Sequence, residues 1–195
     1  MSSLRRLVQP FTKPIEIEGH SRSGPGLKTT PTVKFDPSIV SKSVKADLRK
    51  NIGLLDDIEK KHGQQIYEAA LRSILAGRDL HVLSAALMII DGMTKGRAAE
   101  LALSLNNRAT ALIDRERQAS LGISHAKWMY SNAPCMKDPS RPVAADARQD
   151  SAHRSANGKQ YEIGKGLFVD GKWTWPGAEE GCKCSSRAIL PGLEE

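Results

Sequence analysis

The stretch EEGCKCSS, residues 179–186, places two of the chain's three cysteines on either side of one lysine. Cys182 and Cys184 are poorly placed for a mutual disulfide, because an S–S bond requires a specific geometry. Two thiolates on one tight turn can instead share a metal ion. Cys135 and His153 supply a third thiol and an imidazole, and three cysteines with one histidine complete a tetrahedral structural zinc site.

The zinc site is one of two interpretations of these residues. The spacing is not that of a zinc finger, because only the last two candidate ligands are close in sequence. In the alternative, the cysteines are buried free thiols that cluster behind Trp128 or Trp173, and His153 hydrogen-bonds locally. His125 is a weaker candidate ligand. Bound zinc requires sulfur atoms roughly 4 Å apart, which makes the two interpretations testable by distance.

A polar pattern, D-x-R-x4-H-x3-N-G-K, surrounds the histidine. Its members are Asp146, Arg148, His153, Asn157, Gly158 and Lys159. Asp146 or Asp150 is expected to pair with Arg148 or to orient His153, as a carboxylate does for a metal-bound imidazole. The same residues also suit an acid–base site. No serine nucleophile motif, phosphate loop or pair of catalytic carboxylates accompanies them.

The elements that carry these residues are predicted from periodicity and end signals. Apolar residues spaced three and four apart indicate a helix from an Asp36 cap to Gly63, and a second over about 64–76. Asp79 is expected to cap an apolar third helix at the centre of the core, ending at Gly92. A fourth runs from Thr94 to about 121.

The pattern changes after Gly122. HAKWMYS alternates as a strand does, and GLFVDGKWTW is typical of a hairpin that turns at Asp170-Gly171. Residues 132–157 are expected to be irregular, and RAIL to add a last short strand. The fold class predicted is α+β: a helical region over 36–122, with about four helices, and a small antiparallel, cysteine-bearing part over 123–195.

Residues 1–35 differ from the rest, because they are rich in proline and glycine and cannot bury much apolar surface alone. We expect an extended arm that contacts another chain, and a disordered tail is the alternative. The chain of 195 residues carries a net charge of +7, which favours nucleic acid, an anionic membrane or an acidic partner, although many basic surfaces are simply solvated. No apolar run is long enough to cross a membrane, and no secretory signal is evident. We therefore expect a reducing compartment.

The C-terminal half resembles the C-terminal domain of MuF-like phage head morphogenesis proteins. GISHAKWMYSNAPC, the D-x-R-x4-H-x3-N-G-K pattern and WPGAEEGCKC occur in family order, over about residues 95–190. The matching positions are Gly122, Trp128, Asp146, Arg148, His153, Asn157, Gly158, Lys159, Pro176, Cys182 and Cys184. Two positions depart from the family: Leu103-Ser104-Leu105 replaces an Arg-Thr-Glu triplet, and Gly181 replaces an asparagine.

This resemblance implies a non-enzymatic minor head (capsid) protein of a tailed phage. It would be made in the host cytoplasm and act inside the capsid near the portal vertex of the virion. Portal protein, major capsid protein and packaged DNA, contacted without sequence specificity, are the implied partners, with no membrane. A metal-dependent nuclease using His153 and a zinc-stabilised DNA-binding protein are the alternatives. A nuclease needs an open metal position, whereas three cysteines and a histidine form a closed site.

Overall fold

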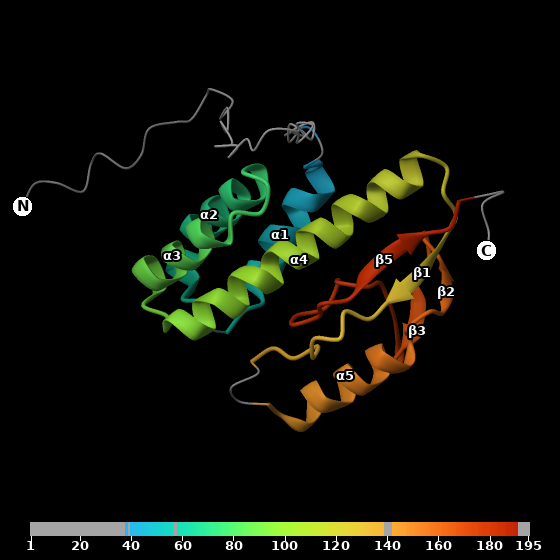
Figure 1. Cartoon of the computed structure of the whole chain (residues 1–195). Helices are drawn as coiled ribbons and strands as arrows, with labels where there is room; N and C mark the ends of the chain where they lie inside the picture. The colour runs from blue at the N-terminus through green and yellow to red at the C-terminus, as the bar shows by residue number, and fades with distance from the viewer. Residues whose placement is uncertain (1–37, 39, 57, 139–141, 191–195) are drawn as a thin grey trace, which may run out of the picture. The chain divides into compact units, whose positions relative to one another are not determined.

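The computed structural model describes residues 38, 40–56, 58–138 and 142–190 (Figure 1). The predicted arm, residues 1–35, and the predicted Asp36 cap lie outside them. The elements are α1 (Lys42–Gly53), a 3₁₀ turn η2 (Lys60–His62), α2 (Gly63–Leu75), α3 (Leu80–Asp91), α4 (Lys95–Ser120), β1 (His125–Met129), α5 (Ala144–Ser155), β2 (Gln160–Glu162), β3 (Leu167–Val169), β4 (Lys172–Thr174) and β5 (Ser185–Ala188). The predicted α+β class is confirmed.

Three of the first four helices, α1, α3 and α4, begin at a residue whose side chain caps the helix. Asp79 accepts hydrogen bonds from the first-turn amides of α3, and Thr94 does the same for α4. Ser41 caps α1 in the same way, because its side chain accepts a hydrogen bond from the Val44 amide. The first helix is shorter than predicted and stops at Gly53. Leu55 and Ile58 continue its apolar spacing but are buried in a non-helical connection.

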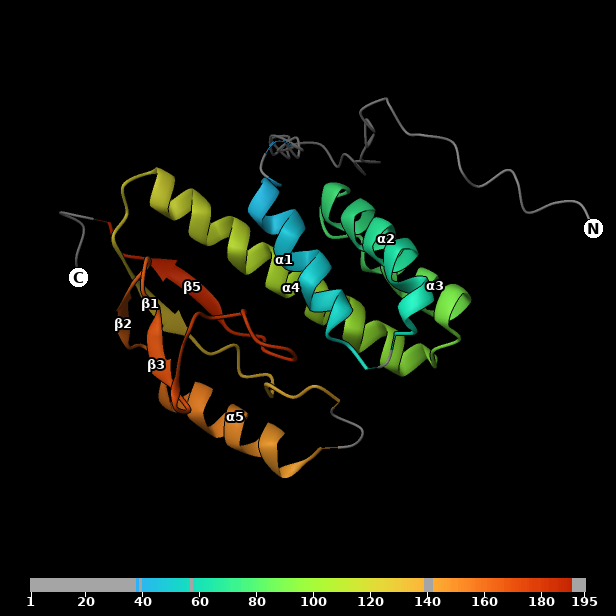
Figure 2. The same cartoon turned by 180° about the vertical axis from the view of Figure 1, so that it is seen from behind.

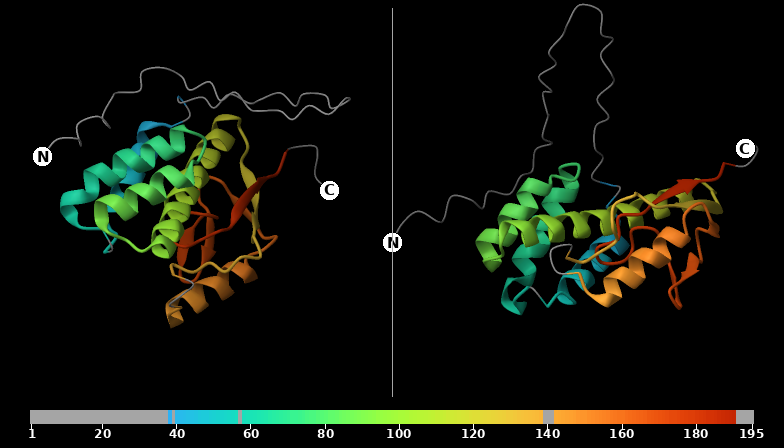
Figure 3. Two further views of the ribbon diagram at one scale, coloured as in Figure 1. Left: turned by 60° about the vertical axis from the view of Figure 1, so that its left-hand side comes forward. Right: turned by 60° about the horizontal axis from the view of Figure 1, so that its bottom comes forward.

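Helix α4, rather than α3, is central to the core, which corrects the expectation from α3's apolar composition. Helices α1, α2 and α3 and strand β5 all pack on α4, and the two views of Figure 3 show it running between the other helices and the strands. Only Leu83 and Leu87 of α3 are fully buried, while Ile89 is 82% exposed. Small residues such as Ala102 and Ala109 let neighbours approach α4 on several sides.

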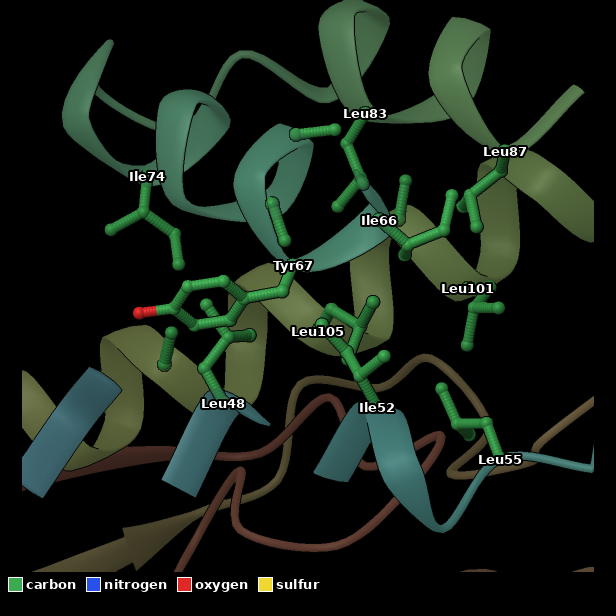
Figure 4. Packing of buried hydrophobic residues seen from close by; sticks show 14 of the residues in the cluster. Leu48, Ile52, Leu55, Ile66, Tyr67, Ile74, Leu83, Leu87, Leu101 and Leu105 are labelled. Atoms are coloured by element: carbon green, nitrogen blue, oxygen red, sulfur yellow. The ribbon is translucent and has the colours of Figure 1, made fainter. Parts of the chain in front are cut away.

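Aliphatic side chains fill the helical core. Figure 4 shows side chains from α1, α2, α3 and α4 converging on one cluster. Its labelled members are Leu48, Ile52, Leu55, Ile66, Tyr67, Ile74, Leu83, Leu87, Leu101 and Leu105. The buried polar pair Ser73 and Asn106 is hydrogen-bonded, with Asn106 Nδ2 donating to Ser73 Oγ at 3.1 Å and each side chain also donating to a backbone carbonyl.

The strands form two small antiparallel sheets. One has the order β2-β1-β5, and the other is the β3–β4 hairpin, which turns at Asp170-Gly171 as predicted. In β1, Ala126 and Trp128 point inward and are fully buried. Strand β1 pairs with two strands distant in sequence, Trp128 lying opposite Ser186 of β5 and Ala126 opposite Tyr161 of β2. Figure 2 shows β1 between its neighbours from behind.

The prediction of an irregular segment over 132–157 is wrong, because α5 occupies Ala144–Ser155. Its sequence is polar and its apolar stripe is narrow, so the periodicity gives little signal. The buried residues of α5 are Asp146, Asp150 and His153, all polar. Within the described residues, no helix combines the length and apolarity needed to cross a membrane.

Candidate metal centre

The four predicted ligands come together in the structure. One donor atom from each of Cys135, His153, Cys182 and Cys184 lies within 4.8 Å of every other, and all four side chains are buried. Cys135 Sγ is 3.6 Å from Cys184 Sγ, and Cys182 Sγ is 3.4 Å from His153 Nδ1. Tetrahedral zinc with bonds of the usual length would separate two sulfurs by about 3.8 Å and a sulfur and a nitrogen by about 3.5 Å. The cluster therefore has the size and chemistry of a metal site.

The four ligands come from three parts of the C-terminal fold. Cys135 lies on the loop after β1, His153 on the last turn of α5, and Cys182 and Cys184 on the turn before β5. Trp128 of β1 forms the apolar wall behind them, with its ring 5.1 Å from that of His153 in an edge-to-face arrangement. Trp173, the other wall considered from the sequence, is half exposed on the hairpin.

Helix α5 holds the loop that carries Cys135. Asp150 accepts a hydrogen bond of 2.8 Å from the backbone N–H of Cys135, and Gln149 donates one of 3.1 Å to the Cys135 carbonyl. Gln149 also donates to the Glu180 carbonyl at 3.0 Å, which joins this loop to the Cys-x-Cys turn. Asp150 therefore positions a cysteine rather than the histidine.

Glu179 occupies the place at His153 that was predicted for Asp146 or Asp150. The Nε2 atom of His153 faces Glu179 Oε1 at 3.8 Å, while Nδ1 faces the sulfurs. Glu179 is fixed by Lys172, whose Nζ lies 2.7 Å from Oε2. A carboxylate on the far nitrogen of an imidazole fixes its orientation and tautomer for metal binding. The signal that sequence reasoning missed was EEGC, an acid three residues before a candidate ligand.

The predicted pairing of Arg148 with Asp146 or Asp150 is also wrong. Arg148 extends to the hairpin turn, with Nε 3.3 Å from Asp170 Oδ2. Asp146 instead accepts from the Val143 amide at the start of α5 and the Lys137 amide, both at 3.4 Å. Helix starts favour such an acid, because their amides lack intrahelical partners.

The remaining motif residues, Asn157, Gly158 and Lys159, hydrogen-bond to the backbone in and just after β1. Gly158 N–H donates to the Trp128 carbonyl at 2.7 Å, and the Trp128 N–H donates to the Lys159 carbonyl at 2.9 Å. Asn157 Oδ1 accepts from Tyr130 N–H at 2.9 Å. His125, the weaker candidate ligand, is exposed and contacts Ser124 instead of the cluster.

Backbone amides point at two of the sulfurs. Gly177 N–H donates to Cys182 Sγ at 3.3 Å, and Lys183 N–H donates to Cys135 Sγ at 3.5 Å. Hydrogen bonds to a charged form stabilise that form, so these amides favour thiolates over thiols. Together with the burial of all four groups, this is the environment of a metal thiolate rather than of an ordinary apolar thiol.

The protonation equilibria of the cluster place the negative charge on one sulfur, because interactions with Cys135 and Cys184, together with burial, raise the pKa of Cys182. Hydrogen bonds with Cys182 and Cys184 hold the pKa of Cys135 well below its usual range, against the effect of burial. Burial alone would lower the pKa of His153, but hydrogen bonds to Cys135, Cys184 and Glu179 outweigh it and raise that pKa to about 11. The cluster therefore favours a thiolate with a bound cation, whether that cation is a proton on the imidazole or a metal ion.

The turn that carries the cysteine pair is anchored to α4. Gly181 N–H donates to Ser104 Oγ at 3.1 Å, and Lys183 Nζ lies 3.6 Å from Glu100 Oε2. Gly181 has a φ of 72°, which asparagine also tolerates better than most residues. In this chain a Cβ at Gly181 would lie 2.6 Å from Lys137 N, so the turn has room only for glycine at this position.

Comparisons of the chain with protein-family models, curated proteins and solved structures find no match.

Proposed function

We propose that this chain is a non-enzymatic minor head protein of a tailed bacteriophage whose C-terminal part is held together by one structural zinc ion. The buried set of three sulfurs and one imidazole nitrogen within 4.8 Å of one another supports the zinc part of the proposal, and the head role rests on the resemblance of about residues 95–190 to MuF-like proteins. Four protein ligands leave no position for a substrate or a reactive water, which is the pattern of structural zinc. Magnesium and calcium prefer oxygen ligands, which this set lacks.

Bound zinc would stabilise the C-terminal part of the chain, as a large apolar core stabilises other domains. The strands around the cluster are three to five residues long, and such small sheets are weakly stable alone. An ion bound by Cys135, His153 and the Cys-x-Cys turn would join the β1 loop, α5 and β5 through one centre. Metal binding of this kind contributes directly to folding free energy.

The motif shared with MuF-like proteins supports the structural role. Trp128 packs on His153, and Gly158 and Lys159 hydrogen-bond the backbone of Trp128. Ser104 occupies the middle position of the family's Arg-Thr-Glu triplet and accepts from Gly181 through its hydroxyl, as a threonine would. The motif residues thus make contacts that maintain the fold around one centre, rather than converging on an open cleft.

The nuclease alternative is disfavoured by the same geometry. His153 is 1% exposed, and both of its ring nitrogens face protein groups. Incubation of the purified chain with plasmid DNA and divalent metals tests this, and we expect no cleavage. Cleavage that is lost in a folded His153→Ala variant would establish the nuclease instead.

The head role is tested by quantitative mass spectrometry of purified phage heads that encode this chain. We expect a low copy number relative to the major capsid protein, and retention in heads that contain the portal. Deletion of residues 1–35 should leave the metal centre intact and reduce incorporation, because we assign docking to that arm. Absence of the chain from purified heads would refute the proposal, and unchanged incorporation would refute the role of the arm.

A further inference from the structure

The outward face of the β2-β1-β5 sheet is basic. Residues directly opposite on neighbouring antiparallel strands share a face, and Lys127 of β1 lies opposite both Gln160 of β2 and Arg187 of β5. The alternate residues Ala126 and Trp128 point into the core, which turns Lys127 and Arg187 outward. Within the described residues, neither of these two cations has an ion-pair partner.

Two exposed aromatic rings lie on the hairpin that follows this sheet's strand β2. Phe168 and Trp173 are cross-strand partners on the β3–β4 hairpin, 58% and 50% exposed, with ring centroids 5.6 Å apart and planes at 64°. Lys165 Nζ lies over the Trp173 ring, 4.2 Å from its centroid. Large aromatic side chains are normally buried, so a half-exposed pair on a short hairpin indicates a contact surface.

A hollow lies where the β3–β4 hairpin meets strands β1 and β2. Its volume is about 300 Å³, and its walls include Trp173 and Lys165 from the hairpin side together with His125, Gln160 and Glu162 from the sheet. Glu162 is the one acid among its lining residues, all of which the structure describes. The hollow thus offers an aromatic ring, a flexible ammonium group, and amide, imidazole and carboxylate groups that suit the polar edge of a flat ring.

We propose that this surface, formed by Lys127, Arg187, Lys165, Phe168 and Trp173 around the hollow, binds single-stranded nucleic acid. An acidic peptide would engage the cations and leave the rings unused, and a proline-rich peptide would do the reverse. Each nucleotide of a single strand carries both a phosphate and an unpaired base, so it uses both features. In a duplex the bases are already stacked and cannot reach the rings. This proposal goes beyond the head role and does not depend on it.

The test is fluorescence anisotropy of the full zinc-loaded chain with a labelled oligothymidylate of about 15 nucleotides, compared with a duplex of equal length. We expect tighter binding to the single strand. Trp173→Ala should weaken it about fivefold or more, the loss typical of one base–aromatic stack, and Trp173→Phe should restore most of it. Unchanged affinity in Trp173→Ala, with the fold intact by circular dichroism, would overturn the proposal.

The cations are tested by a charge-matched pair of variants. Lys127→Gln with Arg187→Gln should lower the slope of log K against log salt by about 1.4, since each phosphate contact to a single strand contributes about 0.7. Lys45→Gln with Lys50→Gln on α1 removes the same charge from another exposed site and should change little. Equal losses in both double variants would mean attraction by net charge alone. Trp173-dependent binding of oligoglutamate as tight as that of oligothymidylate would indicate a protein partner. Either result would refute the proposal.

These measurements separate this inference from the head role. Binding in solution requires no phage particle, so a chain absent from heads could still bind oligothymidylate through Trp173. Conversely, a chain found in heads that fails to bind would refute this surface and leave the head role standing.

Discussion

Gly181→Ala is expected to disrupt the metal centre although it adds one methyl group. Gly181 immediately precedes Cys182 and has a φ of 72°, in the region that disfavours side chains. Its Cβ would lie 2.6 Å from Lys137 N and closer still to the Met136 carbonyl. That backbone cannot easily yield, because α5 holds both the amide and the carbonyl of the adjacent Cys135. The methyl group should therefore push the Cys-x-Cys turn away from Cys135.

The size of the effect follows from a matched control. Gly171, in the hairpin turn, has a φ of 78°, and a Cβ there meets nothing within 4 Å. Alanine in the left-handed region costs about 1–2 kcal/mol at either position. Overpacking against fixed backbone adds about 1–3 kcal/mol at Gly181 alone. We expect the free energy of unfolding to fall by about 2–5 kcal/mol in Gly181→Ala and by about 1–2 kcal/mol in Gly171→Ala.

Urea unfolding with zinc and a reductant present measures this difference, and metal analysis of the same samples measures zinc per chain. Gly181→Ala should bind zinc more weakly, whereas Gly171→Ala should match the unmodified protein. Equal destabilisation by the two substitutions, with full zinc content in both, would refute the packing of the turn on the Cys135 loop.

Three further substitutions test other contacts. Glu179→Gln should lower zinc affinity about 10- to 100-fold in chelator competition. Glu180→Gln, which affects partly exposed ion pairs with Arg97 and Lys137, should not, and equal losses would contradict the role of Glu179. Asp150→Asn should lower the free energy of unfolding by about 1–3 kcal/mol, because a buried carboxylate loses charge-assisted bonds; an unchanged urea midpoint would count against that network. Leu87→Ala should cost about 2–5 kcal/mol and the exposed Ile89→Ala less than about 0.5 kcal/mol, and the reverse order would mean that α3 faces the other way.

The sequence predicted those parts of the fold that carry strong local signals. Asp79 and Thr94 are strong caps, and Asp170-Gly171 has the positive φ values of its turn. Helix α5 was missed because its buried residues are polar, so that no apolar period marks it. Helix α3 was misplaced as the central helix because composition shows how apolar a helix is, not how many neighbours it has. The small residues of α4 allow several neighbours to pack on that helix, and this effect depends on tertiary packing.

The candidate site was predicted by residue type, and its supporting groups were not. Cysteine and histidine are few enough in this chain that chemistry alone selected Cys135 and His153. Choosing the carboxylate that faces His153 required knowing that α5 turns Asp150 toward Cys135 and leaves Glu179 for the imidazole. Acids are numerous, and their partners depend on the direction of each side chain, which spacing in sequence does not determine.

The central claim is that the three cysteines and His153 bind one zinc ion. X-ray absorption at the zinc edge, on protein purified under reducing conditions, tests it most directly. We predict one zinc per chain with three sulfur ligands at about 2.3 Å and one nitrogen at about 2.0–2.1 Å. A folded, reduced protein that binds no zinc, and whose stability neither zinc nor a chelator changes, would contradict the claim.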